Sequence, residues 1–213
     1  MRNEMLAIAS AVALSIAGSA GAVTTITSGS YTLNDGSFGT GLGVHSNGTQ
    51  LNTSPLNANV NMDGSAVTFS STDLLSETGS GEATIVGPFD NLDVSFAKGW
   101  DSITFAIDPV KKTPSDMEIF INGSSTAAFS GSGCSICTIA GSGLSKFTVS
   151  GPSITELDFT FSQSVTDAKQ FRVEGPTAVP EPATWGMMLL GFGVMGATMR
   201  RARGKNSAAL TGA

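Results

Sequence analysis

The sequence predicts an all-β fold: an antiparallel β-sandwich or jelly-roll ectodomain, followed by a single C-terminal transmembrane helix. Three observations predict it. Glycine accounts for 26 of the 213 residues, while only 13% of the residues are charged. Short β-favouring runs, separated by Gly, Asn, Asp, Pro and Ser, recur from Thr24 to Gly175. An uncharged run near the C-terminus then has the composition of a membrane span.

The first 22 residues have the pattern of a secretory signal peptide. Arg2 precedes an apolar run from Met5 to Ala17, and Ala20 and Ala22 supply small side chains at positions −3 and −1 of a cleavage site. We expect the mature chain to begin near Val23 and to be exported into an oxidising compartment. A buried N-terminal helix is the alternative interpretation.

Residues 23–175 are expected to form one β-domain with a core rich in phenylalanine. Asn122 and Gly123 tolerate the positive φ of a tight turn, so they predict a hairpin between the runs on either side. No convincing helical period appears in this region. The clearest predicted strands are 66–70, 83–86, 92–96, 102–107, 117–121, 146–150, 156–161 and 170–174.

The segment from Val23 to Val179 is strongly acidic. It contains 15 acidic and 6 basic residues, a net charge of about −9, and the remaining basic residues lie at the two ends of the chain. An acidic surface repels phosphate backbones, which proteins bind through Lys and Arg. We therefore expect no nucleic-acid partner.

Cys134 and Cys137 form a Cys-x-x-Cys pattern between two glycine-rich stretches. In an exported protein this spacing predicts a local disulfide. A redox role is less favoured, because no helix N-terminus or cation is evident nearby to lower a thiol pKa. A zinc site is weaker still, because His45 is the only histidine that could join the two cysteines.

The residues 59–64 resemble the opening of a calcium loop, because polar oxygens stand at alternate positions before a glycine. The twelfth position is Ser70, where a complete loop has a bidentate Glu. A polar turn is therefore the favoured interpretation. Calcium held with the help of a second loop, through Asp90 and Asp93, stays open.

No enzyme signature stands out, and we expect no catalytic residue, metal or cofactor. His45 lies in a turn-rich stretch without an evident nucleophile or orienting acid. A pair of carboxylates could still meet in space and hydrolyse a glycosidic bond. The candidates for such a pair are Asp101, Asp108, Glu156 and Asp158.

Residues 176–182 are expected to form an exposed linker. It contains Pro180, Glu181 and Pro182, and each proline fixes φ and lacks a backbone N–H, so regular structure should break there. This break would separate the β-domain from everything that follows it.

The run 183–199 carries no charge and predicts a transmembrane helix, somewhat shorter than the ~20 residues that cross a bilayer perpendicularly. Arg200, Arg201 and Arg203 follow at once in a basic tail, 200–213. Positive charge beside a span is retained in the cytoplasm, so we expect the β-domain outside and the tail inside.

Together, Pro180, Glu181, Pro182 and Trp185, the apolar run and the arginine cluster resemble the PEP-CTERM sorting domain of Gram-negative exported proteins, also catalogued as an ice-binding-protein C-terminal motif. The resemblance covers the last 25 to 30 residues. It implies recognition and processing by an exosortase, with the Pro-Glu-Pro residues as recognition elements. Two features depart from the family pattern: Gly186 replaces the usual alanine, and residues 206–213 extend beyond the arginines.

These features predict an exported bacterial surface or extracellular-matrix protein of unknown ligand, anchored in the inner membrane before processing. Its expected partners are an exosortase-like enzyme and, by the resemblance, extracellular polysaccharide. A carbohydrate-binding surface module is the alternative, with Tyr31, Asp93 and Trp100 as candidate contacts. For Trp100, packing in the core or in a turn is the favoured interpretation. A secreted hydrolase is less favoured.

Overall fold

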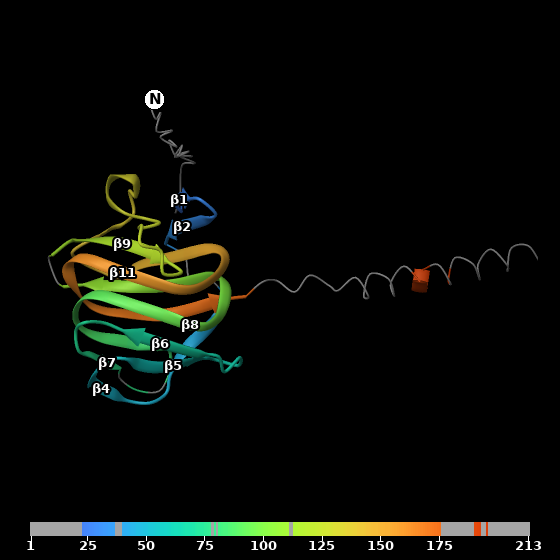
Figure 1. The fold of residues 1–213 in the computed structure, drawn as a ribbon, viewed down its shortest axis with the longest axis horizontal. Helices are drawn as coiled ribbons and strands as arrows, with labels where there is room; N and C mark the ends of the chain where they lie inside the picture. Colours follow the sequence, from blue (N-terminus) through green and yellow to red (C-terminus); the bar gives the residue numbers. More distant parts are fainter. Residues whose placement is uncertain are drawn as a thin grey trace, which may run out of the picture. The chain divides into compact units, whose positions relative to one another are not determined.

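Eleven β-strands, joined into one curled antiparallel sheet, build the part of the chain that the computed structural model describes: residues 23–36, 40–77, 79, 81–110, 113–175, 190–192 and 195 (Figure 1). The chain divides into two units, Met1–Gly175 and Pro176–Ala213. The strands are β1 (Thr25–Ser28), β2 (Tyr31–Asp35), β3 (Leu42–Ser46), β4 (Gln50–Thr53), β5 (Leu56–Val60), β6 (Ala66–Ser70), β7 (Leu75–Glu77), β8 (Thr84–Pro109), β9 (Ser115–Ile121), β10 (Thr138–Ile139) and β11 (Ser145–Glu174).

Two long strands, β8 and β11, organise the sheet, and Figure 1 shows them as curved ribbons. Residues 145–150 of β11 pair with 102–107 of β8, and residues 156–160 of β11 pair with 91–95 of β8. The register shifts between these two ladders, which marks the bend of both strands. Each long strand therefore contributes to two different parts of the sheet.

Phenylalanine side chains from these two parts meet in the core. The ring centroids of Phe105 on β8 and Phe159 on β11 lie 4.9 Å apart, and those of Phe69 on β6 and Phe171 on β11 lie 5.0 Å apart. All four side chains are fully buried. Edge-to-face aromatic pairs of this kind add to the free energy gained from burying apolar area.

The all-β class is confirmed, but several predicted strands are segments of longer ones. The run 66–70 is β6, as expected. The runs 83–86, 92–96 and 102–107 fall within or beside β8, and the last three predicted runs fall within β11. The sequence between them contains Gly and Pro, which usually indicate turns. Here both strands continue through these residues, and the pairing of β8 with β11 skips residues 151–153, where the register shifts.

The predicted turn at Asn122 and Gly123 is present, with φ angles of 54° and 68°. It ends β9, as its residue types favour. The second arm differs from the expectation, because it forms only an isolated bridge between Ile119 and Phe129. The chain then turns into a 3-10 helix at Gly131–Gly133, which carries it away from the hairpin.

Candidate functional site

The structure joins Cys134 and Cys137 by a disulfide, with Cα atoms 5.3 Å apart. Both side chains are buried against the hydrophobic core. The backbone N–H of Met117 on β9 donates to the carbonyl oxygen of Cys137, at 2.8 Å. Reactive cysteines are usually accessible, so this burial favours a structural disulfide that holds the loop against β9.

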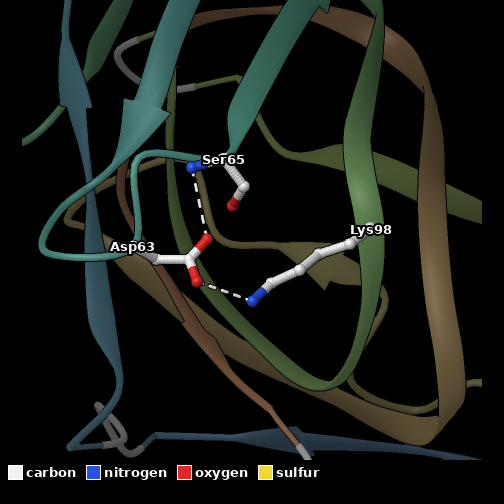
Figure 2. A network of polar contacts seen from close by, with 3 residues as sticks. All are labelled: Asp63, Ser65 and Lys98. Atoms are coloured by element: carbon white, nitrogen blue, oxygen red, sulfur yellow. Dashed lines mark hydrogen bonds and ion pairs between the residues drawn. The ribbon is translucent and has the colours of Figure 1, made fainter.

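The segment considered for calcium forms a turn that is fixed by an ion pair (Figure 2). Asp63 accepts a hydrogen bond from the Lys98 ammonium at 2.7 Å and another from the backbone N–H of Ser65 at 3.2 Å. The Lys98 hydrogen bond is the main reason that the pKa of Asp63 is lowered. Because Lys98 already neutralises this carboxylate, the turn interpretation holds and the arrangement does not favour calcium at Asp63.

Lys98 also fixes the turn to the bend of β8. Its Nζ atom lies 4.2 Å from the centroid of the Trp100 ring, within the range of a cation–π interaction. Trp100 is only 2% exposed, so it cannot serve as the exposed stacking surface considered for a carbohydrate. This burial agrees with packing in the core, the interpretation favoured for Trp100, and does not favour a carbohydrate contact there.

Three acidic residues meet on the outer face of the sheet. Asp93 on β8 and Asp158 on β11 are direct cross-strand partners, and Glu156 lies two residues before Asp158 on the same face. One carboxylate oxygen from each residue lies within 4.8 Å of the other two. Asp93 was considered for calcium, and Glu156 and Asp158 were considered as a hydrolytic pair, but only the strand register brings the three together.

The sequence-predicted acids do not all join this cluster. Asp108 instead lies 3.6 Å from the ammonium of Lys169, which also contacts Asp167 at 2.9 Å. Asp101 is not part of the acidic cluster. The Tyr31 hydroxyl accepts a hydrogen bond from the Asn122 side-chain amide at 3.4 Å, so Tyr31 supports the hairpin turn.

Burial and the neighbouring charges of Asp93 and Glu156 raise the pKa of Asp158 to about 6. A raised carboxyl pKa means that the native state binds the proton more tightly than the unfolded chain. The stability contributed by protonated Asp158 is therefore fully present below pH ~4 and is lost as the pH rises through about 6. At neutral pH three like charges repel one another on this face.

The Asp158→Asn variant should therefore melt at a higher temperature than the native protein at pH 7, by about 2–4 °C, and at nearly the same temperature at pH 4. The measurement is thermal unfolding across this pH range. Asp101→Asn, outside the cluster, is the matched control and should raise the melting temperature less at pH 7. Equal pH dependence of the two variants would contradict the electrostatic account of the cluster.

A shallow polar groove of about 420 Å³ lies at another place on the same unit. Its walls are residues 45–47, at the end of β3 and in the turn after it, and residues 59–64, at the end of β5 and in the turn after it. His45 and Asn59 are cross-strand partners, which sets these two walls side by side. The sequence identified the second wall as a polar turn, but it gave no indication of the neighbouring strand.

The remaining predicted site lies in the C-terminal unit. The family model of the PEP-CTERM protein-sorting motif matches residues 178–203. The chain carries a PEP-CTERM sorting motif. No curated protein and no solved structure matches the chain.

The PEP-CTERM motif confirms the family resemblance, and it implies export to the cell surface and recognition by an exosortase. The match includes all of the predicted sorting residues. These residues, and the cleavage-site residues of the predicted signal peptide, lie outside the described part of the chain: Pro180, Glu181, Pro182, Trp185, Arg200, Arg201 and Arg203, and Ala20 and Ala22.

The predicted transmembrane helix also lies largely outside the described residues, because only 190–192 and 195 are described within 183–199. None of the helices in the described part of the chain is long and apolar enough to cross a membrane. Membrane anchoring by 183–199 therefore stays a prediction.

Proposed function

We propose that the chain is an exported protein of the bacterial surface or extracellular matrix, with an all-β ectodomain that has a structural or binding role and no catalytic one. The PEP-CTERM match at residues 178–203 carries this proposal. The disulfide between Cys134 and Cys137 supports it, because disulfides persist in oxidising compartments outside the cytoplasm.

In this proposal the signal peptide 1–22 is removed, and the helix 183–199 holds the precursor in the inner membrane with the tail 200–213 in the cytoplasm. The exosortase then recognises Pro180, Glu181 and Pro182 and processes the chain there. The arginine cluster supports this topology, because positive charge directly beside a span is retained in the cytoplasm.

A hydrolase receives less support. The acidic cluster lies at outward-facing positions of two paired strands, and its members are only half-buried. A glycosidase holds its acid and its base or nucleophile on either side of the scissile bond, usually in a cleft that surrounds the sugar. Extracellular polysaccharide is instead proposed as a partner, and no nucleic acid is expected.

The test is the intact mass of the protein recovered from the envelope and the medium of a host with the exosortase and of a host without it. We expect a chain that begins near Val23 in both hosts and ends near Pro180–Pro182 only when the enzyme is present. A Glu181→Ala variant should lose this processing. Pro176→Ala, in the same linker but before the matched segment, is the control and should be processed normally.

An intact C-terminus in both hosts would overturn exosortase processing and would leave a protein anchored by a single span. A mature chain that still carries residues 1–22 would overturn export through the signal peptide. The same spectra check the disulfide, because the oxidised chain lacks the two thiol hydrogens of Cys134 and Cys137.

A further inference from the structure

The polar groove between residues 45–47 and 59–64 combines apolar side chains with four uncharged side chains that both donate and accept hydrogen bonds: Ser46, Asn47, Asn59 and Asn61. Asn47 and Asn59 face each other across it, with the Asn59 amide donating to the Asn47 side-chain oxygen at 2.7 Å. A carboxamide offers two N–H donors and two acceptor lone pairs. This one bond therefore leaves most of the capacity of both amides for a ligand.

The wall formed by residues 61–64 is rigid. The backbone N–H of Asn61 donates to the carbonyl oxygen of Gly43 on β3 at 2.8 Å, and that of Gly64 donates to the carbonyl oxygen of Val60 at 2.8 Å. The ion pair between Asp63 and Lys98 holds the other side of the turn (Figure 2). A groove with fixed walls loses little conformational entropy when it binds a ligand.

Met62 supplies an exposed apolar side chain to the lining of this groove. Met62 is 89% exposed as a residue and its φ is 67°, an uncommon backbone conformation for a bulky residue. Backbone hydrogen bonds of the neighbouring Asn61 and Gly64 fix the turn that contains it. An exposed, flexible apolar side chain beside a row of amides can cover the C–H face of a ligand whose hydroxyl groups contact the amides.

The charges around the groove select for a neutral ligand. Lys98 neutralises Asp63, so the groove holds no uncompensated carboxylate that would attract a cation. The β-domain as a whole is strongly acidic, so it repels anionic ligands. Uncharged hydroxyl groups on a C–H framework, as in a saccharide, match both the amides and Met62.

We propose that this groove binds a short neutral segment of a polysaccharide, through the side-chain amides of Asn47, Asn59 and Asn61 and the apolar contact of Met62. The inference deepens the proposed function by giving its polysaccharide partner a site and by specifying a neutral saccharide, and it rests on that function for the choice of polysaccharide as the partner. Binding by the purified protein does not depend on sorting.

The experiment uses the full chain, purified in a detergent with a phosphocholine head group, because sugar-based detergents would compete for the groove. The probes are hexasaccharides of glucan, galactan and mannan, with an alginate hexasaccharide as the anionic comparison, and binding is measured by titration calorimetry. We expect at least one neutral probe to bind more tightly than alginate. Asn59→Ala and Asn61→Ala should each weaken its binding about tenfold.

Asn57→Ala is the matched control, because Asn57 is an exposed residue on the same strand, β5, and is not part of the groove. Its binding of the saccharide should equal that of the native protein. Met62→Ser should weaken binding without changing the melting temperature, which separates loss of contact from loss of folding.

The proposal is overturned if none of the neutral probes binds at millimolar concentration, if alginate binds more tightly than all of them, or if Asn59→Ala and Asn61→Ala bind as well as Asn57→Ala. These results would not affect the sorting proposal, because that proposal is tested separately by the intact mass of the processed chain. Normal processing combined with absent saccharide binding would reject the groove alone, and the reverse result would reject the sorting proposal alone.

Discussion

The Phe105→Ala variant is expected to lower the free energy of unfolding by about 3–5 kcal/mol, the largest effect of any single substitution considered for this protein. Phe105 is fully buried on β8. Its ring centroid lies 4.9 Å from that of Phe159, 5.7 Å from that of Phe147 and 6.1 Å from that of Phe171. All three partners belong to β11, so one alanine would leave a cavity where the two long strands meet.

Urea unfolding, followed by the fluorescence of the buried Trp100, measures this loss. Phe120→Ala is the matched control, because Phe120 is a half-buried phenylalanine on the outward side of β9. It should cost about 1 kcal/mol. Similar midpoints for the two variants would show that Phe105 is not at the centre of the core.

The strands that the sequence predicted well are those with strong local alternation. Val67 and Phe69 are buried while their neighbours Thr68 and Ser70 are half-exposed, and the predicted bounds of β6 match the structure. Strands such as β3 and β4 were missed, because their short polar sequences, LGVHS and QLNT, are composed like loops. Pairing with neighbouring strands, which local sequence does not encode, makes them part of the sheet.

The candidate sites also differ in whether the sequence alone could reveal them. The sorting motif could be read from the sequence because its residues are consecutive and are recognised by type and order. The acidic cluster could not, because Asp93 and Asp158 meet only through the register of β8 and β11. The polar groove depends likewise on the pairing of His45 with Asn59. A site built from several strands can be located only when the pairing of those strands is known. The even distribution of acids and amides along the sequence does not reveal that pairing.

The second large effect is expected at Gly41, directly before β3. A Cβ atom added there would lie 2.6 Å from the carbonyl oxygen of Val173 and 2.8 Å from Cγ of Glu174. Val173 is also the register partner of Leu42, so backbone and not only a side chain must move. Overpacking of this kind should lower the free energy of unfolding of Gly41→Ala by about 1–3 kcal/mol.

The loss of stability in the Gly41→Ala variant should be greatest near the C-terminal end of β11. If β3 separates from Val173, the backbone after Arg172 opens more often, and trypsin should cleave there faster than in the native protein. Gly133→Ala is the control, because an added Cβ there meets no atom within 4 Å, and it should leave both stability and cleavage unchanged. Equal cleavage of the two variants would contradict the account. Glu174 lies just before the unit that carries the sorting motif. Tight packing at Gly41 therefore stabilises the last residues of the β-domain, directly before that unit in the sequence.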